Sequence, residues 1–344
     1  MNNTLYERYQ QAKIDHPGKY ARDLARLLGV SEAELIHARV GHDAHRLQAN
    51  TRILLADLEH IGVTQSITRN HYAVHELMGR YHNQHLNGHA GLILNPRELD
   101  LRLFFNQWAS AFSMSETSKC GVRHSIQFFD HQGDALHKVY TTDETDLPGW
   151  MALVERHRNE ENPPLILHPA EVVTLSTVLD AEKIDREWRE MTDVHQFFPL
   201  LNRNKLTRQQ AFRAVGDDLA FQVDNGALTQ LLNTAQQWQN EIMIFVSNRG
   251  CVQIFTGQIE RLMSLKGWIN VVNRRFNLHL DENAIAESWV TRKPTKDGIV
   301  TSLELFAADG TQIAQLYGQR TEGQAEQTHW REQIAALQAK DVAA

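Results

Sequence analysis

The sequence contains little cysteine and no long apolar run, and each absence excludes a class of protein. Only two of its 344 residues are cysteines. Cys120 and Cys251 lie far apart and outside any C-x-x-C pair. This spacing favours neither a disulfide framework nor a thiolate zinc site, and it indicates reduced thiols. No stretch approaches the ~20 apolar residues that cross a bilayer, and the N-terminus has no apolar signal core. We therefore expect a cytoplasmic protein without membrane insertion.

An excess of basic charge is also absent. The chain has 35 Lys and Arg against 42 Asp and Glu, a formal charge of -7, whereas nucleic-acid-binding proteins usually have a basic face. Residues 21–35 have the apolar spacing and glycine of a helix-turn-helix. Their second helix would begin Ser31-Glu32-Ala33-Glu34, however, and would approach phosphates with two carboxylates. We expect a plain helical hairpin and no nucleic-acid partner, and a DNA-binding regulator is a distant alternative.

Short enzyme motifs are missing as well. His75-Glu76 begins like the zinc-protease motif H-E-x-x-H, but Gly79 stands where the second histidine is needed. The histidine-rich segment 82–89 contains Asn87-Gly88, which breaks any helix that would align a metal site. Neither a glycine-rich phosphate loop nor a G-x-S-x-G elbow occurs. Since no nucleotide-binding signature is present, redox chemistry would need an external electron donor.

The chain does contain an internal repeat. The segment Ser125–Tyr140 (SIQFFDHQGDALHKVY) matches Ser302–Tyr317 (SLELFAADGTQIAQLY) without a gap at an offset of 177 residues. The segment Asn70–Gly79 matches Asn248–Gly257 at an offset of 178. In each copy a helical part precedes strands joined by short turns, which favours antiparallel pairing. We predict an α+β fold with internal duplication, in which two similar halves, 1–163 and 164–344, each carry a helical part and a large, mostly antiparallel sheet.

Local signals mark several elements of this fold. Ser31-x-x-Glu34 is a capping box that begins a helix, and Thr207 begins the corresponding helix of the second copy. Asn248-Arg249-Gly250 predicts a turn between two strands of a hairpin, and Ala308-Asp309-Gly310 predicts another. The charged and proline-rich segment Glu155–Pro164 is the expected junction of the two halves.

Eighteen histidines are many for this length, and imidazole is a common metal ligand. One of them, His195, lies in the aromatic segment Trp188–Leu201. If this segment is one continuous helix, the spacing places His195 on the apolar face. A histidine there is either a hydrogen-bonded core residue or an axial haem ligand, because haem needs an imidazole, apolar walls and cations for its propionates. That apolar face comprises Trp188, Met191, His195, Phe198 and Leu201.

Two further segments contain polar residues of the kind that such a site needs. Alternation along residues 99–106 places Arg102 and Phe104 on the face opposite three leucines. Along residues 312–320, Gln315 and Tyr317 share a face, and Arg320 follows a glycine. Each segment is also explained by a sheet with an exposed polar side.

Four segments resemble the cytoplasmic hemin-degrading and hemin-transport family of Gram-negative bacteria. They are Gly91–Phe105 (GLILNPRELDLRLFF), Ser125–Tyr140, the run DVHQFF around His195, and Ile244–Gly257 (IFVSNRGCVQIFTG). The resemblance covers nearly the whole chain. It implies that the protein binds haem in the cytoplasm and opens the ring in a haem oxygenase-like reaction that releases iron. It also implies an external electron donor and delivery of haem by an inner-membrane importer. A non-enzymatic haem carrier or store is the alternative.

The resemblance also implies roles for individual residues. His195 would be the proximal iron ligand, and Arg208 would lie on the distal side. His75 would mark a weaker, secondary haem site. The second copy would keep the iron ligand, because His16 and Glu32 stand near the places of His195 and Arg208 in the first copy. Arg102 and Phe104 of the first copy would also contact the haem. The other haem contacts that the resemblance implies are Phe245, Lys293, Gln315, Tyr317 and Arg320.

Overall fold

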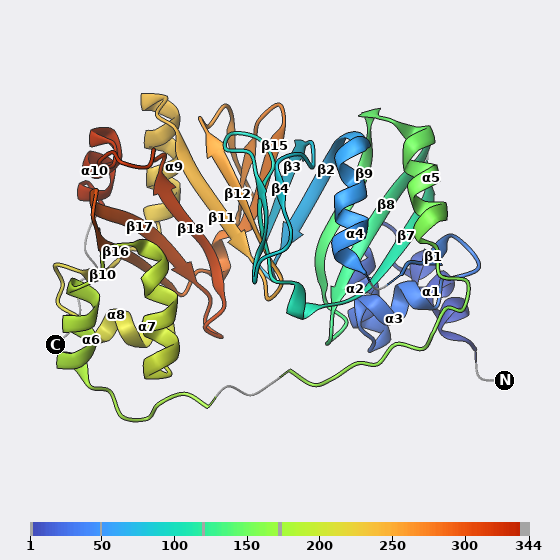
Figure 1. Ribbon diagram of the computed structural model, residues 1–344, viewed down its shortest axis with the longest axis horizontal. Coiled ribbons are helices and arrows are strands. Elements are labelled where there is room, and N and C mark those ends of the chain that lie inside the picture. Colours follow the sequence, from blue (N-terminus) through green and yellow to red (C-terminus); the bar gives the residue numbers. More distant parts are fainter. Residues whose placement is uncertain (1–2, 49, 119–120, 171–173, 338–344) are drawn as a thin grey trace. The chain divides into compact units, whose positions relative to one another are not determined.

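The computed structural model describes residues 3–48, 50–118, 121–170 and 174–337. The chain forms two compact units (Figure 1). Unit 1 contains residues 1–69, 76–171 and 248–253, and unit 2 contains residues 70–75, 172–247 and 254–344. Each unit therefore includes a short segment from the other half of the sequence. The boundary between the two repeats at 163/164 stays a prediction from the sequence, and it is not the boundary between the compact units.

The helices of unit 1 are short, and all but α2 begin with a side-chain cap. They are α1 (Leu5–Asp15), α2 (Ala21–Leu28), α3 (Glu32–His37), α4 (Thr51–Asp57) and α5 (Leu147–His157). The predicted capping box begins α3, since Ser31 accepts a hydrogen bond from the Glu34 amide and Glu34 accepts one from the Ser31 amide. Four of the six residues of α3 are buried. This helix therefore has no free face to place in a DNA groove.

The strands of unit 1 pair antiparallel. The main sheet has the order β1 (Ala44–Arg46), β7 (Trp108–Ser118), β8 (Gly121–Asp130), β9 (Ala135–Thr145) and β2 (Gly62–Arg69). The next strand, β3 (Ala73–Gly79), has only its residues 76–79 in this unit. A second antiparallel group consists of β4 (Gln84–His85), β5 (Gly91–Leu94) and β6 (Asp100–Leu103).

Unit 2 repeats this plan. Its helices are α6 (Ala181–Arg189), α7 (Phe197–Asn204), α8 (Arg208–Ala214), α9 (Ala227–Trp238) and α10 (Thr328–Ala335). Its main antiparallel sheet has the order β10 (Ala220–Val223), β16 (Glu287–Thr295), β17 (Gly298–Phe306), β18 (Gln312–Gly318) and β11 (Ile242–Ser247). The next strand in this order, β12 (Cys251–Gly257), has its residues 254–257 in this unit. The strands β13 (Leu262–Leu265), β14 (Trp268–Val272) and β15 (Phe276–Asp281) form a separate antiparallel group.

The repeated hairpins have the same register. Ser125 pairs with Tyr140 in unit 1, and Ser302 pairs with Tyr317 in unit 2. Both hairpins carry an irregularity near the turn, between Phe128 and Phe129 in one and at the equivalent place in the other. The predicted α+β fold with duplicated antiparallel sheets is confirmed. The structure adds that the two copies share the position of a bulge.

The three helices α6, α7 and α8 cover one end of the unit 2 sheet (Figure 1). Their core is aromatic: the rings of Trp188 and Phe197 lie 4.6 Å apart, and Phe212 lies 5.9 Å from Phe306 on β17. Each such aromatic pair stabilises the fold by about 0.5–1.5 kcal/mol, in addition to the stabilisation that comes from burying its apolar surface. This packing holds the beginning of α7 against the sheet.

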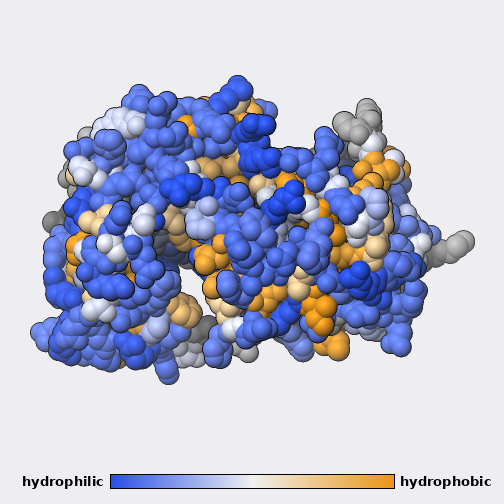
Figure 2. Space-filling model, turned by 45° about the horizontal axis from the view of Figure 1, so that its top comes forward, coloured by the Kyte–Doolittle hydropathy of each residue, from blue (hydrophilic) through white to orange (hydrophobic). Residues whose placement is uncertain are grey.

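The surface is predominantly polar, in keeping with a mean hydropathy of -0.44. Figure 2 shows one face on which hydrophobic side chains form small, separate patches among hydrophilic ones. Within the described ranges, no helix combines the length and apolar character that a bilayer crossing requires.

Candidate functional site

The segment that carries His195 is not one continuous helix. Helix α6 ends at Arg189, and a short 3-10 turn, η3 (Val194–Gln196), comes before α7. The prediction that His195 lies on the apolar face is therefore wrong: its side chain is 90% exposed. Phe198 from the same predicted stripe is 64% exposed, while Trp188 is buried. The break shifts the phase of the second helix, so that Phe197 rather than Phe198 enters the core.

Asp193 causes this break. Its carboxylate accepts a hydrogen bond of 2.8 Å from the backbone N–H of His195, and Gln196 Oε1 accepts one of 3.3 Å from the backbone N–H of Asp193. This capping box begins a new helical segment at Val194. The pattern D-x-x-Q that forms the box is visible in the sequence, but the apolar spacing across it suggested a single helix.

The same carboxylate orients the imidazole. His195 Nδ1 lies 2.7 Å from Asp193 Oδ1. Because a carboxylate only accepts, Nδ1 is the nitrogen that carries the hydrogen in the neutral form of the ring, and the lone pair of that form is on Nε2. The backbone N–H of His195, and next its imidazole, lower the pKa of Asp193 and keep it ionised. A carboxylate on Nδ1 is the arrangement that orients many metal-binding histidines.

Two cations lie beside Phe197, two residues after His195. The guanidinium of Arg208 is 5.2 Å from the centroid of the Phe197 ring, and Lys293 Nζ is 4.8 Å from it. Arg208 is the first residue of α8, which begins with the predicted cap at Thr207. Its side chain is 26% exposed, while that of Lys293 is buried. Arg208, predicted for the distal side, and Lys293, predicted as a haem contact, therefore both lie against the ring of Phe197.

A carboxylate that sequence reasoning missed joins these cations. Glu304 on β17 is fully buried, and it accepts hydrogen bonds from Lys293 Nζ at 2.8 Å and Arg208 Nη1 at 3.1 Å. Burial alone would raise the pKa of Glu304, but Lys293 and Arg208 outweigh it and lower the pKa to about 2. An acid between two leucines on a strand is usually solvent-exposed, so the alternation offered no reason to choose this residue.

Strand β18 continues the polar network. Gln312 Nε2 donates to Glu304 at 2.8 Å, Gln315 Nε2 donates to Gln312 at 2.6 Å, and the Tyr317 hydroxyl donates to Gln315 at 2.9 Å. The predicted shared face of Gln315 and Tyr317 is present. Phe245 on β11 packs on it, with its ring 5.1 Å from that of Tyr317. Burial raises the pKa of Tyr317, so the phenol stays neutral at ordinary pH.

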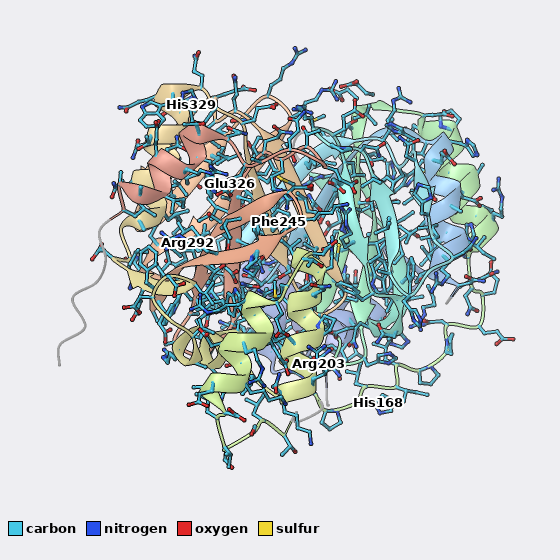
Figure 3. All side chains as sticks on the ribbon, turned by 60° about the vertical axis from the view of Figure 1, so that its left-hand side comes forward. His168, Arg203, Phe245, Arg292, Glu326 and His329 are labelled. Atoms are coloured by element: carbon cyan, nitrogen blue, oxygen red, sulfur yellow. The ribbon has the colours of Figure 1, made fainter. Side chains whose placement is uncertain are left out.

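Figure 3 shows Phe245 on the unit 2 sheet, together with Arg292, which comes directly before Lys293 on β16. Arg292 stacks on Phe221 at 5.0 Å instead of joining Glu304, because neighbouring strand residues point to opposite faces. Arg320, another predicted contact, follows the end of β18, and its charge acts on the Tyr317 hydroxyl.

The other predicted contacts lie elsewhere. In unit 1, Arg102 on β6 forms an ion pair with Asp100, and Phe104 is 37% exposed directly after the strand. Their contribution to a haem site in unit 2 stays a prediction. His75 is fully buried and packs against Phe276 at 4.7 Å between ring centroids. Burial lowers its pKa to about 3, so its neutral ring is enclosed, and the prediction of a secondary haem site there gains no support.

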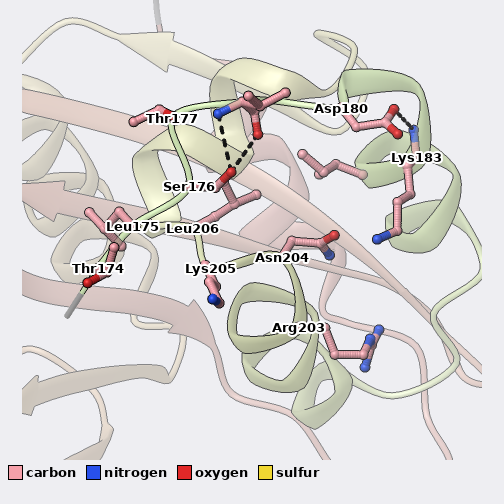
Figure 4. Close-up of a pocket in the computed structure, with 12 residues that line it drawn as sticks. Thr174, Leu175, Ser176, Thr177, Asp180, Lys183, Arg203, Asn204, Lys205 and Leu206 are labelled. Atoms are coloured by element: carbon pink, nitrogen blue, oxygen red, sulfur yellow. Dashed lines mark hydrogen bonds between the residues drawn. The ribbon is translucent and has the colours of Figure 1, made fainter.

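A separate pocket of about 470 Å³ lies in unit 2 (Figure 4). It includes Lys183 on α6 and Arg203 near the end of α7, together with residues 174–178. Neither His195 nor Arg208 lines it. In the part of the chain that the structure describes, no three His, Cys, Asp or Glu side chains gather to hold a metal ion.

The model of the haemin-degrading HemS.ChuX domain matches this chain twice, at residues 29–157 and 205–337. The chain belongs to this family. The two matches give the internal duplication directly, with starting points separated by nearly the offset of the repeated hairpin. His195 lies between the two matches, whereas Arg208, Lys293 and Glu304 fall within the second match.

Relatives of the family cover the whole chain, including His195. The hemin transport protein HemS of Yersinia enterocolitica is 70% identical over 100% of both chains. The heme degrading enzyme ChuS of Escherichia coli O157:H7 is 61% identical, with a TM-score of 0.94 over 97% of this chain and 98% of that chain. The heme-binding protein PhuS of Pseudomonas aeruginosa is 40% identical, with a TM-score of 0.95 over 98% of this chain and 99% of that chain.

Proposed function

We propose that this protein binds haem through Nε2 of His195 and opens the porphyrin ring, which releases iron for the cell. One observation carries the proposal: the imidazole of His195 is exposed, and Asp193 holds Nδ1 so that Nε2 is the free nitrogen. The descriptions of the relatives support it, since HemS is a hemin transport protein, ChuS a heme degrading enzyme and PhuS a heme-binding protein.

Haem is both the ligand and the substrate in this proposal, and its iron supplies the redox chemistry. The chain supplies binding and orientation. Arg208 presents a partly exposed cation beside Phe197, two residues after His195, suited to a propionate or to negative charge near the iron, and Lys293 is buried beside the same ring. Phe245 and Tyr317 form an aromatic surface on the sheet. Since the sequence has no nucleotide-binding signature, electrons come from an external donor.

Replacing His195 with alanine tests the ligand. Titration of hemin into the wild-type protein should shift the Soret band, and His195→Ala should remove most of that shift. His60→Ala, which alters a histidine of unit 1 outside every predicted site, is the control and should keep it. An identical shift in wild type and His195→Ala would contradict the assignment.

A haem carrier or store is the second candidate function, favoured by the description of PhuS as a heme-binding protein. Both functions use the same residues, so a single-turnover experiment has to separate them. The hemin complex is supplied with a reductant and oxygen while carbon monoxide and the Soret band are followed. Carbon monoxide and an open tetrapyrrole indicate the enzyme, and an intact Soret band indicates the carrier.

The proposal places the protein in the cytoplasm, where an inner-membrane importer would deliver the haem. Cys251 is a free, buried thiol, which suits a reducing compartment. Fractionation of cells that express the chain should recover it with cytoplasmic marker enzymes. Recovery with periplasmic markers would contradict this location.

A further inference from the structure

Resting on the haem function proposed above, we propose that Glu304 is the positioning residue of the site. It holds the guanidinium of Arg208 and the ammonium of Lys293 in place on the sheet, and it neutralises one of their two charges. No role was assigned to Glu304 from the sequence.

The contacts of Glu304 occupy both of its oxygens. Oε2 accepts from Arg208 Nη1 at 3.1 Å and from Gln312 Nε2 at 2.8 Å. Oε1 accepts from Lys293 Nζ at 2.8 Å and from Ser302 Oγ at 3.1 Å. Thr291 Oγ1 adds a longer contact of 3.3 Å to Oε1. A carboxylate with this many donors has one orientation, so the cations that it binds are fixed as well.

Exposure distinguishes the members of this cluster. Glu304 and Lys293 are buried, whereas Arg208 keeps a quarter of its side chain exposed while one nitrogen is tethered to Glu304. Arg208 is therefore the member that can contact a ligand, and Glu304 acts through it. Two cations and one anion leave one net positive charge beside the turn of His195. That charge suits an anionic ligand group, and Glu304 limits it.

The first copy shows that the fold does not need a carboxylate at this position. Gln127 pairs with Lys138 in the register in which Glu304 pairs with Gln315. Gln127 is buried and donates to Ser125 Oγ at 3.0 Å, and its strand forms the same hairpin with the same bulge. A glutamine is thus compatible with this sheet, and Glu304→Gln is a natural test that keeps shape and removes charge.

The test uses azide, a small anion that binds ferric haem, on the full-length hemin complex. If Glu304 positions Arg208, Glu304→Gln should weaken azide binding about tenfold, and Arg208→Ala should weaken it at least as much. The double variant should match Arg208→Ala alone, because contributions that act through one group are not additive. Glu287→Gln removes a carboxylate that pairs with Arg213 and Trp289 instead of Arg208 and Lys293, and it is the control for the loss of one carboxylate.

The sign of the effect decides the outcome. Loss of a negative charge by itself would strengthen azide binding, so unchanged or tighter binding by Glu304→Gln overturns the positioning role. No change in Arg208→Ala overturns it too. A readout without haem completes the test: in NMR spectra of the ligand-free protein, rotation of the Arg208 guanidinium should be slow in wild type and fast in Glu304→Gln. If wild type itself gave no Soret shift with hemin, the haem function would fail, while the guanidinium measurement would still report on Glu304.

Discussion

The two copies of the repeat have the same strands but opposite arrangements of charge. In unit 1 the first residue of α3 is Glu32, which pairs with Lys138 on β9. In unit 2 the first residue of α8 is Arg208, which pairs with Glu304 on β17. The helix carries the anion in one copy and the cation in the other.

The difference extends to the histidines. His16 caps the C-terminus of α1 next to a turn, whereas His195 begins a new helical segment with its ring ordered by Asp193. One scaffold thus carries two polar sets, and the set in unit 2 differs from His16 and Glu32 in unit 1 because it combines an imidazole oriented by Asp193 with the cation of Arg208. Either polar set is compatible with the same strand register and core packing, because the strand faces that pack in the core are apolar in both copies.

The largest expected effect concerns which phenylalanine enters the core of unit 2. Phe197→Ala should lower the free energy of unfolding by about 3–5 kcal/mol, because it leaves a cavity beside Trp188 and Phe212. Phe198→Ala, at an exposed site, should change it by less than about 0.5 kcal/mol. Urea denaturation measures both. A larger loss of unfolding free energy for Phe198→Ala than for Phe197→Ala would favour the single helix that the apolar spacing predicted.

The next largest expected effect is on the dependence of stability on pH, to which Glu304 in unit 2 should contribute. The pKa of Glu304 lies at about 2 in the folded protein, below its ordinary value of 4.5, because Lys293 and Arg208 outweigh the effect of burial. A lowered pKa stabilises the protein above pH 4.5, and that contribution, on the order of 3 kcal/mol, is lost as the pH falls from 4.5 towards 2.

Glu304→Gln should therefore flatten the dependence of stability on pH in this window, as followed by urea denaturation at a series of pH values. Gln127→Ala, at the equivalent place in unit 1, alters no titrating group and should leave the slope unchanged. Equal slopes for wild type and Glu304→Gln would show that the carboxylate does not carry the acid sensitivity.

Haem affinity should distinguish the histidines. Loss of the iron ligand in His195→Ala should weaken hemin binding by at least about a hundredfold, above the tenfold to hundredfold range seen when a supporting residue is removed. His16→Ala, the counterpart in the first copy, should bind as wild type does. Spectroscopic titration with hemin checks both, and equal losses would mean that the first copy also binds through its histidine.

The smallest expected effect is that of Asp193. Asp193→Asn keeps the side chain's size but weakens its hold on Nδ1, so hemin affinity should fall about tenfold. The iron–histidine stretching band of the reduced complex should move to lower frequency, since the ligand becomes less basic. Asp217→Asn removes the same charge from an exposed site of unit 2 and serves as the control. An unmoved band in Asp193→Asn would refute the orienting role of this carboxylate.

Local physics made much of this fold predictable. The capping box at Ser31 formed and a helix began at Thr207, as predicted, because each helix start depends only on residues three positions apart. The repeated hairpins formed in one register because a shift by a single residue would turn every buried side chain outward. Leu99, Leu101 and Leu103 are all buried, as the alternation predicted.

The site depended on relations that local patterns do not contain. The sequence by itself determined the duplication, the strands, the caps and the aromatic segment around His195. Only the tertiary structure decided that Asp193 breaks this segment and exposes the imidazole, and that Glu304 is the buried partner of two cations. The reason is physical. Periodicity in the sequence indicates which residues avoid water. The free energy of burying a charge, however, depends on partner groups that come from strands and helices distant in the sequence.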